Sequence, residues 1–239
     1  MSENTKIKAV LFDLDGTLLP MDNDVFTNGY FKMLVKKMAP FGFAPQELID
    51  GVWTGTAAMV KNNGAQSNCD VFWKAFAGAV GERVYAARPQ FEDFYANEFN
   101  QAKMFCGFSE KALETVRAVK AKGMRAVLAS NPIFPMFAQI GRLRWAGIEP
   151  EEFEHITAYE DYAFSKPNPQ YFSTVAEQIG LRTEECLMVG NDADEDGAAA
   201  KTGMQVFLLT DHLINRSGRD IAAFPHGDFA ALQAYLANI

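Results

Sequence analysis

Residues 7–12, Ile-Lys-Ala-Val-Leu-Phe, form an apolar run that leads directly into the sequence Asp-Leu-Asp-Gly-Thr at 13–17. Such a run, rich in β-branched and aromatic residues and stopped by acid and glycine, is typical of a buried strand. Alternate residues of an extended chain share a face, so Asp13 and Asp15 are expected to converge just beyond the strand, where open α/β sheets bind ligands. Two such acids need a cation or a shared proton. A polar strand end with a turn at Gly16 gives the same short pattern, so the rest of the chain must decide.

An alternation of strands and helices begins at Ser109, which is expected to cap a helix that Gly123 ends. Further strands are expected at 124–129, 155–158, 186–189 and 206–209, and helices at 135–145, 169–180, 197–202 and 229–236. This rhythm predicts a parallel sheet covered by helices.

Residues 20–105 lack this alternation and contain no convincing strand. Apolar residues recur there at helical spacing, and the expected helices are 25–40, 45–61, 68–80 and 89–102. The segment is rich in aromatic residues, and we interpret these mainly as core packing. It therefore predicts a compact helical bundle inserted after the first strand.

The charge of the chain argues against partners that are polyanions. Acidic residues number 30 and basic residues 22, for a net charge of −8, and the densest basic spot, Lys36-Lys37, is interpreted as a solvated helix face. These values disfavour binding to nucleic acid or to an anionic membrane. A hydrophobic content of 49% is ample for a buried core, and no apolar stretch approaches the ~18 residues of a membrane span.

The expected location is the cytoplasm. Residues 1–6 have no basic region leading into a long apolar segment, so no signal peptide is predicted. Cys69, Cys106 and Cys186 are widely spaced, without a CxxC pair, and are interpreted as reduced core residues.

Three later strand ends also carry polar residues. Ser130-Asn131 follows the second expected strand, Lys166 precedes the helix that begins near 169, and an acidic cluster at 192–196 follows the fourth expected strand. Each group alone is usually a turn or a solvated loop. Their order and their common placement at one edge of the sheet make the combination specific.

The combination closely resembles the haloacid dehalogenase superfamily of phosphohydrolases that use an aspartate nucleophile. The matches are Asp13, Asp15, Gly16 and Thr17 for the first motif (DxDGT), Ser130 for the second, Lys166 for the third, and Asp192 and Asp196 for the fourth. The resemblance spans the whole chain. It implies an α/β fold with a doubly wound, Rossmann-like parallel sheet, in which residues 1–19 and 106–239 form the catalytic core and 20–105 an inserted α-helical cap.

The resemblance also implies a hydrolase acting on phosphoric monoesters of a small metabolite. Asp13 would attack phosphorus to give an aspartyl-phosphate, and Asp15 would protonate the leaving oxygen and later deprotonate water. Lys166 would offset the negative charge of Asp13 and of the phosphate in the transition state. The expected phosphate-binding residues are Gly16, Thr17, Ser130, Asn131 and Lys166.

Mg²⁺ is the implied cofactor, since an all-oxygen site suits it and it bridges carboxylate and phosphate. The implied ligands are the Asp13 carboxylate, the Asp15 carbonyl and one acid of the fourth motif. This chain departs from the commonest family spelling there, because Asn191 stands where aspartate is usual. We expect Asp192 to be the ligand, with Asp196 orienting a metal-bound water or capping the next helix, and Asp194 facing solvent.

The sequence is also compatible with other activities. A phosphomutase uses the same core, although the lack of histidine in residues 20–30 disfavours a sugar mutase. A dehalogenase is disfavoured by the second acid, Asp15. A phospho-accepting signalling receiver also combines Asp, Ser/Thr and Lys on a doubly wound sheet, but it needs no helical bundle after the first strand. The substrate itself stays open among nucleotides, sugar phosphates and glycolate-like phosphates.

Overall fold

A six-stranded parallel sheet forms the centre of the protein in a computed structural model, which describes residues 6–239. Residues 1–5, on which the prediction of no signal peptide mainly depends, lie outside the described residues. The strands are β1 Ala9–Phe12, β2 Arg125–Leu128, β3 His155–Ile156, β4 Cys186–Gly190, β5 Gln205–Leu209 and β6 His226–Gly227. Their order across the sheet is β3-β2-β1-β4-β5-β6.

β1 lies in the middle of this sheet, paired with β2 on one side and β4 on the other. Its four residues are fully buried, as expected for a strand covered on both faces. Val10 and Phe12 pack into one hydrophobic cluster, and Ala9 and Leu11 pack into a second cluster on the opposite face. The sheet is therefore doubly wound, which confirms the predicted fold class.

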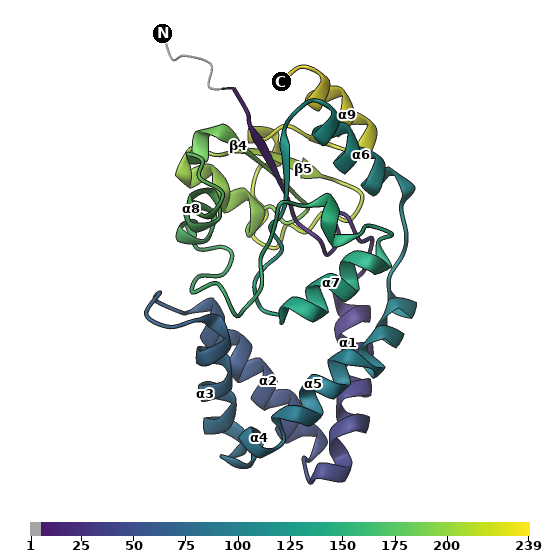
Figure 1. The fold of residues 1–239 in the computed structure, drawn as a ribbon, viewed down its shortest axis with the longest axis vertical. Helices are drawn as coiled ribbons and strands as arrows, with labels where there is room; N and C mark the ends of the chain where they lie inside the picture. Colours follow the sequence, from purple (N-terminus) through teal and green to yellow (C-terminus); the bar gives the residue numbers. More distant parts are fainter. Residues whose placement is uncertain (1–5) are drawn as a thin grey trace.

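Helices cover both faces of the sheet (Figure 1), with α8 on one side and α6 and α9 on the other. The α-helices of this part of the chain are α6 Glu110–Ala121, α7 Met136–Trp145, α8 Pro169–Gln178 and α9 Phe229–Ala237. Shorter 3₁₀ helices on the sheet side are η3 Pro150–Glu152, η4 Thr183–Glu185, η5 Asp196–Thr202 and η6 Ile221–Ala223.

The segment between β1 and α6 is helical, and we call residues 20–105 the helical lobe. Its α-helices are α1 Asn23–Met38, α2 Pro45–Val60, α3 Asn68–Val80, α4 Arg83–Ala86 and α5 Arg88–Ala96, and its 3₁₀ helices are η1 Ala39–Phe41 and η2 Glu98–Phe105. Local capping explains two of the starts, since Asp22 accepts the N–H of Val25 and Ser67 accepts the N–H of Asp70. These helices gather beyond the carboxyl ends of the strands (Figure 1).

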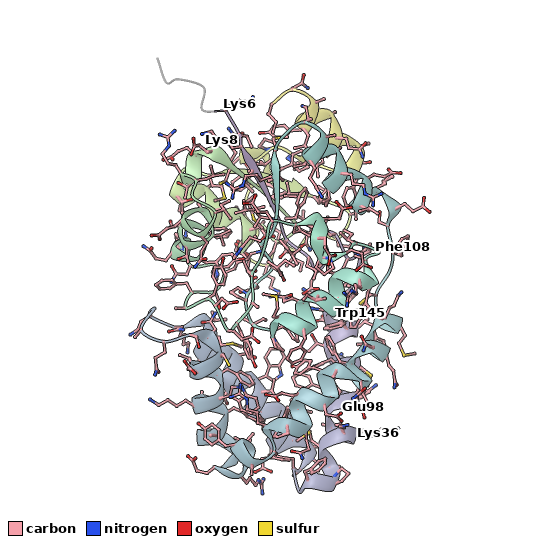
Figure 2. All side chains as sticks on the ribbon, in the orientation of Figure 1. Lys6, Lys8, Lys36, Glu98, Phe108 and Trp145 are labelled. Atoms are coloured by element: carbon pink, nitrogen blue, oxygen red, sulfur yellow. The ribbon has the colours of Figure 1, made fainter. Side chains whose placement is uncertain are left out.

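Aromatic side chains join the lobe to the sheet-containing part of the chain. Trp145, at the end of α7, lies at the boundary between the two parts (Figure 2), and its ring centroid is 5.0 Å from that of Phe99. On the outer side of the lobe, Lys36 is exposed (Figure 2). Its neighbour Lys37 pairs with Asp93 and Glu98, so acids of the lobe itself offset the basic spot noted in the sequence.

Two sets of hydrogen bonds hold the lobe against the carboxyl edge of the sheet. Where the chain enters and leaves the lobe, the Gly107 N–H donates to the Pro20 carbonyl at 2.6 Å. At the start of α3, the fully buried Asn68 donates its backbone N–H to the Tyr162 carbonyl at 2.7 Å and its side-chain amide to the Pro132 carbonyl at 3.1 Å. The lobe thus lies over the strand ends that carry the predicted site residues.

Several local predictions were wrong. Residues 89–102 are not one helix, because Asn97 leaves the helical region (φ −117°, ψ −81°) and separates α5 from η2. Ser109 occupies the N-cap position of α6 without a capping hydrogen bond from its side chain, whereas the helix expected at 197–202 is present as the 3₁₀ helix η5. Both α4 and β6 were missed, since elements of four and two residues give no periodic pattern.

Within residues 6–239, each helix falls short of the length and apolar character needed to cross a bilayer. Cys69, Cys106 and Cys186 are all free thiols.

Candidate active site

Lys166 is the centre of a buried ionic cluster at the carboxyl ends of the strands. Its ammonium donates to Asp13 Oδ1 at 2.8 Å and to Asp196 Oδ1 at 2.6 Å, and its side chain is only 1% exposed. Burial lowers the pKa of Lys166, but the charges of Asp13 and Asp196 outweigh burial and raise that pKa above its ordinary value. The fold therefore brings together residues from the ends of β1, β3 and β4.

Asp13 follows β1 directly and is held from two sides. Oδ1 accepts from Lys166, and the Thr17 hydroxyl lies 3.3 Å from Oδ2 and 3.0 Å from Asn191 Oδ1. Burial raises the pKa of Asp13 to about 7, while the charge of Lys166 opposes this rise. A further cation at this carboxylate would also favour its ionised form.

Two glycines permit the close approaches that form the cluster. Gly16 has φ +79°, and a Cβ built there would lie 2.3 Å from Asn191 Nδ2. A Cβ at Gly190 would lie 2.1 Å from Asp196 Oδ2, so only glycine lets that carboxylate reach Lys166.

Ser130 and Asn131 follow β2 and line the same cavity as Asp13 and Asp15. The buried Ser130 is fixed through its backbone carbonyl, which accepts the Tyr171 hydroxyl at 2.8 Å. Asn131 accepts the Lys166 N–H through Oδ1 at 3.2 Å and donates through Nδ2 to Glu195 Oε2 at 3.0 Å. Asn131, beside Ser130 of the second motif, therefore connects the loops of the third and fourth motifs through these two hydrogen bonds.

Glu195 was not singled out from the sequence, although it lies within the acidic cluster at 192–196 and lines the cavity. Burial raises its pKa to about 7.

The three fourth-motif aspartates occupy different environments. Asp192 lines the cavity, and its Oδ1 accepts the N–H groups of Asp194 and Glu195. Asp196 uses both oxygens, because Oδ1 accepts from Lys166 and Oδ2 accepts the Asp192 N–H at 3.0 Å. Asp194 does not line the cavity; its side chain is 30% exposed, as expected for a residue that faces solvent, and it accepts hydrogen bonds from the hydroxyl and N–H of Ser217.

Asp15 has a partner that was not predicted from the sequence. Its Oδ2 pairs with the guanidinium of Arg142, a fully buried residue of α7 that also donates to Gln139 and lies over the Phe134 ring at 4.2 Å. Within residues 6–239, Asp15 Oδ1 is buried and has no hydrogen-bond partner. Arg142 therefore fixes the direction of one Asp15 oxygen and leaves the other available.

The sequence did contain a signal for Arg142. Ala138, Arg142 and Trp145 share one face of α7 at helical spacing, and all three are buried. An arginine at a position of an apolar stripe needs a buried partner, so this position could have been marked for pairing with an acid.

We predict that replacing Arg142 impairs the turnover step more than substrate binding. In Arg142→Met the Asp15 carboxylate loses the group that orients it, so kcat should fall roughly ten- to a hundredfold. This loss is a fraction of the ~10²–10⁴-fold rate acceleration that a positioned acid–base group supplies. KM should change less than about threefold. Steady-state kinetics would test this, with Arg144→Met as the matched control, since Arg144 lies on the same helix with a 56% exposed side chain. Equal losses in both variants would contradict a positioning role.

The donor set fits Mg²⁺. Its side chains offer only oxygen ligands, and Asp192 Oδ2 accepts no hydrogen bond from residues 6–239. Among those residues, no three His, Cys, Asp or Glu side chains come close enough to form a metal cage. Mg²⁺ does not need one, because it commonly takes one or two carboxylates and completes its shell with water and phosphate oxygens. Asp13 and Asp192 can supply those two carboxylates.

Known proteins are similar to this chain in sequence and in fold. The family model for haloacid dehalogenase-like hydrolases matches residues 7–203. A phosphoglycolate phosphatase of Pectobacterium atrosepticum is 28% identical over 211 residues, covering 88% of this chain and 83% of that protein. The chloroplastic protein SUPPRESSOR OF QUENCHING 1 of Arabidopsis thaliana is 27% identical over 192 residues, which are 77% of this chain but only 16% of that protein.

Two solved structures share the fold. A predicted phosphoglycolate phosphatase from Haemophilus somnus 129PT has a TM-score of 0.60 and 19% identity, covering 98% of this chain and 99% of the other. A HAD-hydrolase, YfnB, from Bacillus subtilis, solved with bound magnesium, has a TM-score of 0.54 and 18% identity, covering 98% and 100%.

Proposed function

This chain belongs to the haloacid dehalogenase-like hydrolases and is a phosphatase of that family, and on this basis we propose that it hydrolyses a small phosphomonoester through an aspartyl-phosphate. The observation that carries the proposal is the contact of Lys166 with both Asp13 and Asp196 at the carboxyl edge of the sheet. Such a cluster provides a buried carboxylate nucleophile beside a fixed positive charge.

In the proposed first step, an oxygen of Asp13 attacks phosphorus, the bond to the ester oxygen breaks, and Asp15 gives its proton to that oxygen. In the second step, Asp15 takes a proton from water, which attacks the same phosphorus and frees the Asp13 carboxylate. Asp15 suits this role because it lines the same cavity as Asp13 and has one oxygen not engaged by Arg142.

The phosphoryl oxygens would be held by Lys166, Ser130 and the loop at Gly16 and Thr17, with Asn131 as a further donor. Lys166 would balance negative charge that grows during transfer. Its position is fixed before the reaction, since Asp196 and the Asp13 carboxylate already hold the ammonium.

Mg²⁺ is the proposed cofactor, held by the Asp13 carboxylate, the Asp15 carbonyl and Asp192, and when bound it would neutralise charge on the phosphate. The Bacillus subtilis relative solved with magnesium supports this choice, as does the all-oxygen donor set. Asp196 would act indirectly, because both of its oxygens already accept hydrogen bonds.

We further propose that residues 1–19 and 106–239 act as the catalytic core and 20–105 as a cap. The position of the helical lobe over the strand ends supports this division, as does the pairing of its two connections at Pro20 and Gly107. A cap in this place excludes bulk water from the reacting phosphoryl group.

The proposed activity can be tested with p-nitrophenyl phosphate and a panel of phosphorylated metabolites, with Mg²⁺ or with excess EDTA. We expect release of inorganic phosphate that stops when EDTA is added. Transfer of the phosphoryl group to a sugar phosphate without phosphate release would instead indicate a mutase. A stable phosphoprotein without turnover would indicate a receiver.

We predict that the fourth-motif aspartates differ in their effect on the metal requirement. Asp192→Asn should raise the Mg²⁺ concentration for half-maximal activity by more than about 100-fold. Replacing a residue that only hydrogen-bonds to a metal ligand already lowers metal affinity by ~10–100-fold, and losing a direct ligand should cost more. Asp196→Asn should raise it about tenfold. Asp194→Asn is the control and should leave it unchanged, because Asp194 bonds to Ser217 away from the cavity. If Asp196→Asn has the largest effect, the ligand assignment is wrong.

A further inference from the structure

The cavity that contains Asp13 and Asp15 extends far into the helical lobe. Its volume is about 460 Å³, within the ~300–1,000 Å³ typical of ligand pockets. An apolar cavity of ~150 Å³ already accepts benzene. The volume therefore exceeds what a phosphate with a two-carbon group requires.

The part of this cavity formed by the lobe is mainly apolar. Its lining includes Phe26, Phe31, Val52, Phe72, Trp73 and Phe91. Tyr30 and Tyr95 add two phenols whose hydroxyls are 2.8 Å apart and bond to each other. Burial raises the pKa of both phenols, that of Tyr95 to about 12, so both are neutral at physiological pH. This arrangement favours an organic group that gains from burial.

The charges lining the cavity are distributed unevenly. Among the described residues, the lobe contributes one acid, Asp24, to the lining and no lysine, arginine or histidine. The cation that does line the cavity, Arg216, is an exposed residue of the loop after β5. A carboxylate or second phosphate carried into the lobe would be desolvated without a partner of opposite charge, which is costly.

One polar group in this apolar region, the indole N–H of Trp73, can still donate a hydrogen bond. Trp73 is 6% exposed, and within residues 6–239 its indole N–H makes no hydrogen bond of ordinary geometry, although the Tyr159 hydroxyl lies near it. The indole N–H can donate to a single neutral oxygen of a ligand, and such a contact needs no charge.

We propose that this enzyme takes phosphomonoesters of neutral, mainly apolar alcohols or phenols, with the phosphate at Asp13 and the organic group in the helical lobe. The inference rests on the proposed function and narrows its substrate. It excludes as preferred substrates the esters whose organic group carries a second anionic group, such as the glycolate ester in the name of the Pectobacterium relative.

The test uses phosphonates, whose carbon–phosphorus bond is not hydrolysed by this chemistry, so that binding is measured apart from turnover. Calorimetry with Mg²⁺ would compare propyl-, pentyl- and heptylphosphonate with phosphonoacetate on the wild-type protein. Affinity should rise about fourfold per methylene until the cavity is filled. Phosphonoacetate should bind more weakly than pentylphosphonate. Affinity that is independent of chain length, or tightest for phosphonoacetate, would overturn the inference.

A matched pair of variants places the organic group in the lobe. Thr56 lines the cavity and Thr54 is exposed on the same helix, and each hydroxyl donates to the carbonyl four residues earlier. Thr56→Lys should weaken pentylphosphonate at least tenfold and strengthen phosphonoacetate, while Thr54→Lys should change neither. Equal behaviour of the two variants would overturn the proposed placement.

Turnover of the corresponding alkyl and aryl phosphates separates this inference from the proposed function. Hydrolysis that favours phosphoglycolate over pentyl phosphate would overturn the inference and leave the proposed function intact. If no ester is hydrolysed, the proposed function fails, and the phosphonate affinities still decide whether the cavity takes apolar groups.

Discussion

Replacing Asp13 by asparagine is expected to lower kcat by about 10⁴-fold or more, the scale on which loss of a covalent nucleophile is felt. The amide has nearly the same volume as the carboxylate and can still accept from Lys166, but it cannot form the acyl-phosphate. Phosphate release from p-nitrophenyl phosphate would measure the loss. Asp211→Asn is the control, because Asp211 also follows a strand, β5, but is exposed and outside the cavity.

The same variant should not be less stable. Burial raises the pKa of Asp13 from 3.8 to about 7, and an acid whose pKa is raised on folding destabilises the folded state once pH exceeds its unfolded value. In metal-free buffer, Asp13→Asn should therefore melt above wild type at pH 8. The difference should shrink as pH falls from 7 toward 4. An active Asp13→Asn protein would contradict the mechanism, whereas an inactive but unfolded one would show only a structural role.

The features of the fold that were predicted correctly depend on local sequence. β1, β2, β4 and β5 are mainly apolar segments of four or five residues, and three of them lead into the polar loops of the predicted site. In a parallel sheet those loops share one edge, so Asp13, Ser130 and Asp192 were expected to meet without knowledge of the tertiary packing. The contact of Lys166 with Asp13 is consistent with that reasoning.

What could not be predicted depends on how elements pack. The pairing of Arg142 with Asp15 requires the orientation of α7 relative to β1, which residues 135–145 do not specify. Likewise, the helical periodicity that marks Phe72 as apolar is the same whether its ring fills a core or lines a cavity. Asp192 and Asp196 also have different proposed roles, because Asp196 accepts a hydrogen bond from Lys166 on another loop, whereas Asp192 bonds within its own loop.

Replacing Lys166 by methionine should damage both turnover and stability. The ammonium is a fixed positive charge beside Asp13, and losing one such group typically lowers kcat by ~10²–10³. Its removal also leaves Asp13 and Asp196 buried without their shared cation. Breaking a buried ion pair from one side costs about 3–5 kcal/mol. At ~2–4 °C per kcal/mol for a chain of this size, the melting temperature should fall on the order of 10 °C.

The pH dependence of that loss identifies its cause. The pKa of Lys166 is raised in the folded protein, so its favourable charge is present throughout the physiological range and would be lost only in strong alkali. In Lys166→Met the Asp13 carboxylate, whose pKa burial raises to about 7, bears the cost, and protonating it relieves the cost. The variant should therefore recover melting temperature, relative to wild type, between pH 8 and pH 5, and Lys166→Met with Asp196→Asn should recover part of it already at pH 8. Lys201→Met, at an exposed lysine of η5, should match wild type throughout. A deficit in Lys166→Met that does not depend on pH would point to lost packing of the lysine stem, and would contradict the view that its charge holds the two aspartates together.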